Sequence, residues 1–192
     1  MEGRKTLPIG TDDFRKLREN NAYYVDKTLM IKDFLEMQDE VALVARPRRF
    51  GKTLNMTMLR EFFDIAKDSK ALFEGLAIMD TEYASLINSR PVIYFTFKNV
   101  KGVSVEELTA QLKLSMQEEY SYYERIFKGK LDKNSYGTEK FYETYELLMD
   151  RKSSYIYLSS ALLDLTRVVY EFYGIRPVLL IDEYDQPIMS SY

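Results

Sequence analysis

Three short apolar runs constrain the fold of this chain more than any other feature of its sequence. They are Val41–Ala45, Val92–Phe97 and Val178–Ile181. Continuous apolar runs of this length are typical of strands that are covered on both faces, as in a parallel sheet. Because segments with helical spacing separate the runs, we expect an α/β fold with a mostly parallel sheet that helices flank.

The segments between these runs carry apolar residues at helical spacing. One such pattern covers Leu54–Ala66, and another covers Tyr155–Tyr173, where Gly174 is a typical helix end. Ser104 and Glu107 fit a capping box, in which both side chains bond backbone N–H groups at the start of a helix. We therefore expect helices over both patterns and directly after Ser104.

Residues 1–40 are expected to form a helical arm. Thr11 is the expected cap of its first short helix, and Asp26 or Thr28 is the expected cap of the second. Residues 41–192 are the expected core, and a chain of 192 residues suits one main domain. Within that core, residues around 120–152 are rich in Tyr, Lys and Glu, and we expect an insertion of short helices and loops there.

The composition excludes several kinds of chemistry. The chain has no cysteine and no histidine, which rules out disulfides, thiolate or imidazole metal sites, cysteine nucleophiles and histidine acid–base catalysis. Its net charge of −3 argues against bulk electrostatic attraction to nucleic acid. The N-terminal residues lack the apolar core of a signal peptide, and no run of about 18 apolar residues occurs. We therefore expect a cytoplasmic protein without a membrane segment.

The tripeptide Gly51-Lys52-Thr53 has the sequence that ends a phosphate-binding loop. In such a loop, backbone N–H groups and the positive end of a helix stabilise phosphate charge, while lysine reaches the terminal oxygens. Lys52 would contact phosphate, and the hydroxyl of Thr53 would coordinate Mg²⁺. Taken alone the tripeptide is a weak signal, because a turn glycine followed by an exposed lysine has the same sequence.

Two carboxylates follow the last apolar run. Asp182 and Glu183 stand at the end of the strand expected over Val178–Ile181. Asp182 would hold Mg²⁺ through water, and Glu183 would orient or activate the attacking water. Two exposed acids that cap a turn are the alternative. Since each motif follows its own predicted strand, and in the order that phosphoryl transfer requires, we favour a nucleotide site.

Several segments together resemble the predicted AAA-ATPase-like family of bacterial P-loop proteins. They are LPIGTDDFRKLRENNAYYVDKT, RPRRFGKTLNMTMLREFF, LFEGLAIM, PVIYFTFK and PVLLIDEYDQPI. In that family the phosphate loop reads RPRRFGK followed by Ser or Thr, so Arg46 in place of a first glycine belongs to the family's own pattern. The resemblance implies a Walker B motif at Asp182 and Glu183. It also implies a cofactor-binding Walker A loop of Arg46, Pro47, Arg48, Arg49, Phe50, Gly51, Lys52 and Thr53.

The resemblance further implies parts that come after the second motif. ATPases of this class place a strand with a polar sensor after Walker B, and longer members continue into a helical region and a nuclease-like domain. Only Gln186–Tyr192 follow here, too few residues for a strand and its crossover. We therefore expect a partial P-loop core that lacks the sensor strand and lid, and we assign it no nuclease chemistry.

Other features have competing interpretations. Arg46, Arg48 and Arg49 would contact phosphates, a nucleic acid or a neighbouring subunit's nucleotide, or they form an exposed basic loop. Tyr23–Thr28 lies where related ATPases contact adenine, but we favour tyrosines that pack on the core. The chain's 16 tyrosines, several of them near lysines, are better explained by a packed helical insertion than by a nucleic-acid platform.

Taken together, the sequence predicts an ATP- and Mg²⁺-binding module. Lys52 and Glu183 are the expected catalytic residues, and Thr53 and Asp182 are the expected metal ligands. ATP hydrolysis would depend on completion of the core by missing segments or by a partner, either a second copy of the chain or another protein. The alternatives are a nucleotide-binding or protein-interaction fragment without hydrolysis, and a nucleic-acid-binding fragment.

Overall fold

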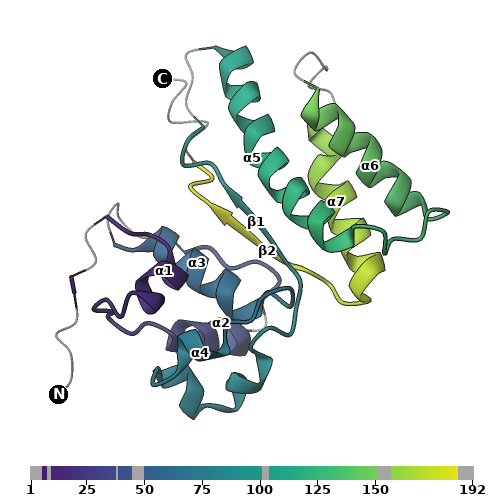
Figure 1. The fold of residues 1–192 in the computed structure, drawn as a ribbon. Helices are drawn as coiled ribbons and strands as arrows, with labels where there is room; N and C mark the ends of the chain where they lie inside the picture. Colours follow the sequence, from purple (N-terminus) through teal and green to yellow (C-terminus); the bar gives the residue numbers. More distant parts are fainter. Residues whose placement is uncertain are drawn as a thin grey trace. The chain divides into compact units, whose positions relative to one another are not determined.

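The computed structural model describes residues 6–7, 10–37, 39–44, 50–100, 104–150 and 157–185. The chain divides into two compact units, residues 1–90 and residues 91–192, and each is described by itself (Figure 1). The sequence divides the chain elsewhere, into an arm of residues 1–40 and a core of residues 41–192. The two compact units do not test that division. The expected α/β class is confirmed, with a small parallel sheet in the second unit.

The first unit is built from helices. They are α1 Phe14–Glu19, α2 Leu29–Met37, α3 Lys52–Phe63, α4 Lys70–Phe73, and two short 3₁₀ helices, η1 Ala77–Asp80 and η2 Glu82–Leu86. Helix α3 confirms a helix at the pattern Leu54–Ala66, but it begins at Lys52 and ends at Phe63, and its apolar stripe is buried against α1 and its neighbours. Helix α1 is capped by Asp13, whose carboxylate accepts from the N–H of Lys16, so the expected cap at Thr11 is wrong.

Aromatic rings fill the core of this unit. Phe62 lies 5.0 Å from Phe63 and 5.4 Å from Phe73, measured between ring centroids, and Phe14 lies 5.0 Å from Phe73. All four side chains are buried. Such ring pairs contribute about 0.5–1.5 kcal/mol beyond the burial of their area. They hold α1, α3 and α4 together.

A buried carboxylate also joins elements of the first unit. Glu61 on α3 accepts from Arg15 on α1 at 2.7 Å, from Lys67 at 2.7 Å and from the Ser69 hydroxyl at 2.6 Å. Burial alone would raise the pKa of Glu61, but these hydrogen bonds outweigh it, and the pKa lies below its ordinary value. The charged carboxylate therefore stabilises the unit.

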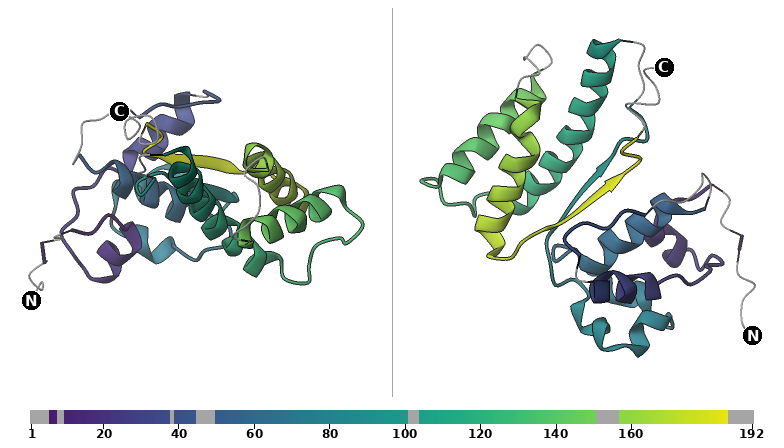
Figure 2. Two further views of the ribbon diagram at one scale, coloured as in Figure 1. Left: turned by 90° about the horizontal axis from the view of Figure 1, so that it is seen from above. Right: turned by 180° about the vertical axis from the view of Figure 1, so that it is seen from behind.

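The second unit contains the sheet. Strands β1 Val92–Thr96 and β2 Val178–Asp182 run parallel, with Val92 opposite Val178 and Thr96 opposite Asp182. Three helices, α5 Val105–Phe127, α6 Tyr136–Met149 and α7 Leu158–Tyr173, pack together beside the strand pair (Figures 1 and 2). The sequence predicted both strands and the helices that begin after Ser104 and end at Gly174.

The core of the second unit lies where these helices meet the strands. The rings of Tyr120 and Phe141 stack 5.1 Å apart and nearly parallel, which joins α5 to α6. Buried aliphatic residues of β1 and α7, among them Ile93 and Leu165, complete the cluster. Ser104 caps α5 by accepting from the N–H of Glu107, as expected. Helix α5 then continues to Phe127, so residues 120–127 extend a long helix instead of beginning an insertion of short ones.

The strand expected over Val41–Ala45 is wrong for the residues that the structure describes. Residues 41–44 are in no strand, and the side chains of Val41 and Leu43 are 84% and 68% exposed. Ala45 lies outside the described residues. A strand needs a neighbouring backbone to pair with, and the described part of the first unit contains no other strand beside this run. An apolar run therefore does not form a strand by itself, because it also needs a neighbouring strand to pair with.

Replacing Glu61 by Gln should destabilise the protein at neutral pH. We expect a loss of about 1–3 kcal/mol in the free energy of unfolding, because the charged hydrogen bonds to Arg15 and Lys67 are weakened. The lowered pKa means that this stabilisation is complete above the ordinary value of 4.5 and is lost as the pH falls through the lower folded value. Urea unfolding at pH 7 and pH 3 measures the difference between wild type and variant at each pH.

Glu143→Gln is the matched control, since Glu143 forms an exposed pair with Lys140 on α6. This variant should change the free energy of unfolding by less than about 0.5 kcal/mol. An equal loss for Glu61→Gln at both pH values would contradict the role of the charge.

Candidate functional site

The start of α3 is the centre of the candidate site. Gly51 precedes the helix with φ 77° and ψ 28°, a left-handed conformation that glycine adopts without steric cost. No side chain caps the helix at this residue. The backbone N–H groups of the first turn of a helix lack intrahelical partners and carry partial positive charge, which makes them suitable for an anion. Lys52 and Thr53 are the first two residues of α3.

The remaining residues of the predicted loop divide into two groups. Phe50 is described, and its side chain is 59% exposed beside Gly51. Arg46, Pro47, Arg48 and Arg49 lie outside the described residues. The structure therefore brings Phe50, Gly51, Lys52 and Thr53 together at one helix start, and the four preceding residues of the loop stay a prediction.

Asp182 and Glu183 lie at the carboxyl end of β2. Asp182 is the last residue of the strand, is 2% exposed, and its carbonyl oxygen accepts from the N–H of Phe97 at 2.9 Å. Glu183 follows with φ 53°, a left-handed conformation that is uncommon for residues other than glycine. Such backbone strain costs about 1–2 kcal/mol. The parallel pairing with β1 places both carboxylates at one end of the strand pair.

The two motifs belong to different units. Gly51, Lys52 and Thr53 are in the first unit, and Asp182 and Glu183 are in the second. The approach of the carboxylates to Lys52 and Thr53, on which a shared Mg²⁺ depends, therefore stays a prediction. Among the described residues no group of three or more acidic side chains lies close enough together to hold a metal ion.

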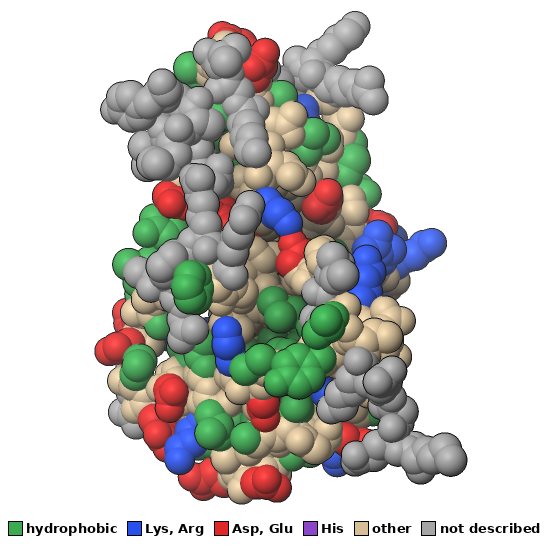
Figure 3. All heavy atoms as spheres, turned by 90° about the vertical axis from the view of Figure 1, so that its left-hand side faces the viewer, with side chains coloured by type: hydrophobic (Ala, Val, Ile, Leu, Met, Phe, Trp, Pro, Cys, Tyr) green, Lys and Arg blue, Asp and Glu red, His purple; other side chains and the backbone are tan. Residues whose placement is uncertain are grey.

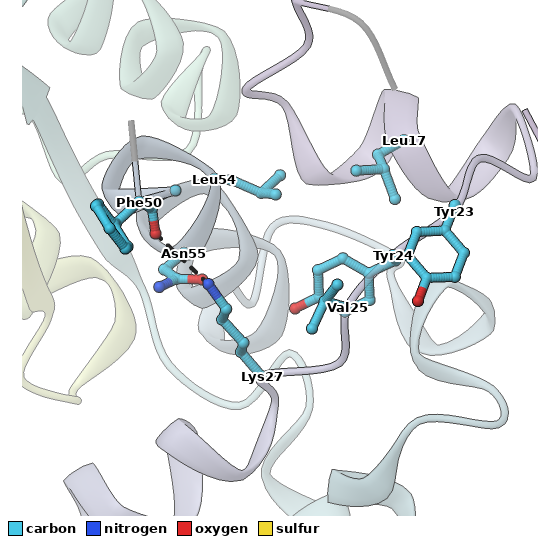
Figure 4. A pocket seen from close by; sticks show the side chains of 9 residues that line it. Leu17, Tyr23, Tyr24, Val25, Lys27, Phe50, Leu54 and Asn55 are labelled. Atoms are coloured by element: carbon cyan, nitrogen blue, oxygen red, sulfur yellow. Dashed lines mark hydrogen bonds between the residues drawn. The ribbon is translucent and has the colours of Figure 1, made fainter. Parts of the chain in front are cut away.

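A pocket of about 350 Å³ adjoins Gly51 within the first unit (Figure 4). Its walls come from α1, from the extended segment that precedes α2, and from the start of α3. The residues that line it are Leu17, Tyr23, Tyr24, Val25, Lys27, Phe50, Gly51, Leu54 and Asn55. No acidic side chain is among them, and the ammonium group of Lys27 lies 3.5 Å from the carbonyl oxygen of Phe50. The pocket therefore combines apolar walls with one cation.

Asp26 holds the extended segment in place. Its carboxylate accepts from the N–H and the hydroxyl of Thr28 at 2.8 and 2.7 Å, and from the N–H of Ala77 at 2.7 Å. Burial would raise the pKa of Asp26, but the hydrogen bonds to Ala77 and Thr28 lower it below its ordinary value. The neighbouring Tyr24 is partly buried, which raises its pKa to about 12. Its ring therefore enters the pocket wall as a neutral phenol.

Sequence reasoning did not assign Lys27 or Asn55 to the site. The sequence favours core packing for the tyrosines of Tyr23–Thr28, and Tyr24 does contact the core through Phe14, with ring centroids 5.4 Å apart. The signal for Asn55 is that a polar residue interrupts the start of the apolar stripe on α3. Only the folded segment shows that both residues line one pocket.

Charged side chains of both signs are exposed on the face drawn in Figure 3. In the face drawn in Figure 3, basic and acidic side chains of the described residues are interspersed, with hydrophobic side chains exposed between them. This distribution agrees with the small net charge of −3.

Within the described residues, no helix has the length and apolar character needed to cross a membrane.

Comparisons with known proteins give a family. A sequence model of the family described as Predicted AAA-ATPase matches residues 8–192. A protein of Azotobacter chroococcum mcd 1, described as an uncharacterized protein in the vnfD 5′ region, is 44% identical over 78 residues. That match covers 40% of this chain and 14% of the relative, so the matched part is a small fraction of a longer protein. No solved structure matches the chain significantly.

The strained backbone of Glu183 can be tested by comparing glycine with alanine. Both substitutions remove the carboxylate, but only glycine relieves the positive φ. We expect the free energy of unfolding, measured by urea denaturation, to be about 0.5–1 kcal/mol higher for Glu183→Gly than for Glu183→Ala.

The same pair of substitutions at Glu146, an exposed position within α6, is the control. There alanine should be the more stable by about 1 kcal/mol, as in any helix interior. A higher stability of alanine at both positions would show that residue 183 is not strained in solution.

Proposed function

The chain belongs to the predicted AAA-ATPase family, and on this basis we propose that it is a cytoplasmic module that binds ATP together with Mg²⁺. The observation that carries the proposal is the start of α3. Gly51 adopts a left-handed conformation there, no side chain caps the helix, and Lys52 and Thr53 follow directly. This arrangement suits the phosphates of a nucleotide.

The phosphates would lie against the N–H groups of the first turn of α3. Lys52 would bind the terminal phosphate oxygens through its ammonium group. Arg46, Pro47, Arg48, Arg49 and Phe50 would complete the loop around them. A left-handed glycine before an uncapped helix is the local geometry that such binding requires, and a phosphate group would satisfy the helix start.

The metal would be held by few protein atoms. Mg²⁺ typically keeps several waters and is bound by one or two protein side chains together with substrate phosphates. We assign this role to the hydroxyl of Thr53 and the carboxylate of Asp182, a buried residue at the end of β2. When bound, the metal would neutralise charge on the phosphate oxygens.

The proposal extends from ATP binding to ATP hydrolysis. Glu183 would accept a proton from the attacking water or orient it. Its left-handed backbone directly after β2 is a strained position, and such positions cluster at functional sites. Binding without turnover is the second candidate, and the variants below separate the two.

Lys52→Ala should lower the affinity for ATP in the presence of Mg²⁺ by at least about tenfold, because a charge-assisted contact to phosphate is lost. Isothermal titration calorimetry measures this change. Lys133→Ala removes an exposed lysine from the loop between α5 and α6 and should leave the affinity unchanged. If folded wild-type protein bound no ATP, the proposed function would be wrong.

Glu183→Gln separates binding from turnover. The variant should bind ATP as wild type does and should lose phosphate release, because the amide cannot accept the proton of the attacking water. A phosphate-release assay measures turnover. If the variant released phosphate as fast as wild type, Glu183 would not have its assigned role. If wild type bound ATP but released no phosphate, the module without turnover would be favoured.

A further inference from the structure

The outer edge of β1, the edge that faces away from β2, is covered by side chains of α5. In a strand, the backbone N–H and C=O groups of alternate residues point to opposite edges. Phe97 donates its N–H to the carbonyl of Asp182, and the carbonyl of Pro91 accepts from the N–H of Val178, so the odd-numbered residues face β2. The even-numbered residues of β1 therefore face the outer edge. They are Val92, Tyr94 and Thr96.

Each of these three outward-facing residues has a hydrogen-bond partner on α5, and the partners are three polar side chains. The hydroxyl of Ser115 donates to the carbonyl of Thr96 at 2.8 Å, the carboxylate of Glu119 accepts from the N–H of Tyr94 at 3.0 Å, and the hydroxyl of Tyr123 donates to the carbonyl of Val92 at 2.8 Å. The bonds therefore follow the strand from one end to the other.

The spacing of these side chains matches the spacing of the strand. Ser115, Glu119 and Tyr123 are four residues apart, which places them on one face of α5. Four residues of helix rise about 6 Å, and two residues of strand rise about 6.6 Å. Helix α5 and β1 run side by side in opposite directions (Figures 1 and 2). Each four-residue step along the helix therefore reaches the next outward-facing residue of β1, and α5 occupies the place of a neighbouring strand.

An edge covered in this way is closed to pairing with another chain. The edge strand of a sheet presents N–H and C=O groups that a second strand can bond, and native proteins commonly cover such edges. The side chains of Glu119 and Tyr123 are 3% and 1% exposed, so they fill the space beside the strand. An approaching strand would have to displace both side chains and break the hydrogen bonds that they make with β1.

We infer that Ser115, Glu119 and Tyr123 prevent a second copy of this protein from pairing its β1 with the β1 of the first. When the same edge of two identical strands pairs about a two-fold axis, each strand presents the same groups to the other. The backbone groups that α5 now bonds would then bond their counterparts in the second copy. Glu119 is the central blocking residue, because it bonds Tyr94 in the middle of the strand. The inference does not depend on nucleotide binding.

Glu119→Ala tests the inference, because alanine removes the carboxylate and preserves the helix. Sedimentation velocity at a series of protein concentrations measures self-association of wild type and variant. The variant should dimerise at least about tenfold more tightly than wild type, since the N–H of Tyr94 becomes available to a second strand. Glu119→Gln retains an acceptor oxygen and should associate no more tightly than wild type.

Glu118→Ala is the matched control, because it removes an exposed carboxylate from the preceding position of α5. This variant should associate as wild type does. If it dimerised as tightly as Glu119→Ala, loss of negative charge would explain the association, and the inference would be wrong.

Amide hydrogen exchange at Tyr94, followed by NMR, identifies the surface that pairs. In dilute Glu119→Ala this amide should exchange at least about tenfold faster than in wild type, because its acceptor is gone. The exchange should then slow as the protein concentration rises and the strands pair. If Glu119 served only the fold, the exchange rate would not depend on protein concentration.

Two further results would overturn the inference. One is a folded Glu119→Ala variant that associates no more tightly than wild type at any concentration. The other is tighter association that leaves the Tyr94 amide unprotected, since a different surface would then pair. If Glu119→Ala does not fold, Glu119→Leu takes its place, because leucine fills the space of glutamate without an acceptor, and the same results are expected.

Discussion

Burial of the apolar stripe of α3 is the constraint on which the first unit and the candidate site depend. Met58, Phe62 and Phe63 are buried on one side of this helix, and Phe62 contacts the ring of Phe73 on α4. With that side fixed in the core, the N-terminal end of the helix is fixed as well, and Gly51 and Asn55 are held beside the segment that precedes α2.

The hydrogen bonds of Glu61 join α1 to the same core, through Arg15. A helix anchored in this way holds its uncapped end in place without a side-chain cap.

The second unit positions its acidic residues by strand pairing. Parallel pairing of β1 with β2 sets Asp182 opposite Thr96, and the buried residues of α5 and α7 pack in the same cluster as those of β1. The carboxylates therefore lie at the carboxyl end of a parallel strand pair, where α/β proteins commonly bind ligands. The two halves of the proposed nucleotide site thus depend on two separate cores. Each of the two motifs is therefore positioned by the packing of its own unit.

Much of the fold could be predicted because its signals are local. Val92–Thr96 and Val178–Asp182 are strands, the cap at Ser104 starts a helix, and Gly174 ends one in the left-handed conformation. The apolar run at residues 41–44 carries a signal of the same kind and forms no strand. The difference is non-local, since a strand exists only where another backbone is placed to pair with it. In the same way, the choice of Asp13 over Thr11 as the cap depends on backbone geometry at the helix start.

The sequence by itself determined the family, the α/β class and the motifs that carry the proposed chemistry, since these depend on residue type and on short spacings. The tertiary structure decided which side chains share a pocket with Gly51. Lys27 and Asn55 are 28 positions apart in the sequence, and no periodicity or motif relates them. They meet because the Asp26 hydrogen bonds fix one segment and the buried stripe of α3 fixes the other. Only packing produces such contacts, because the burial of one face of a helix or segment determines which residues its other face lies beside.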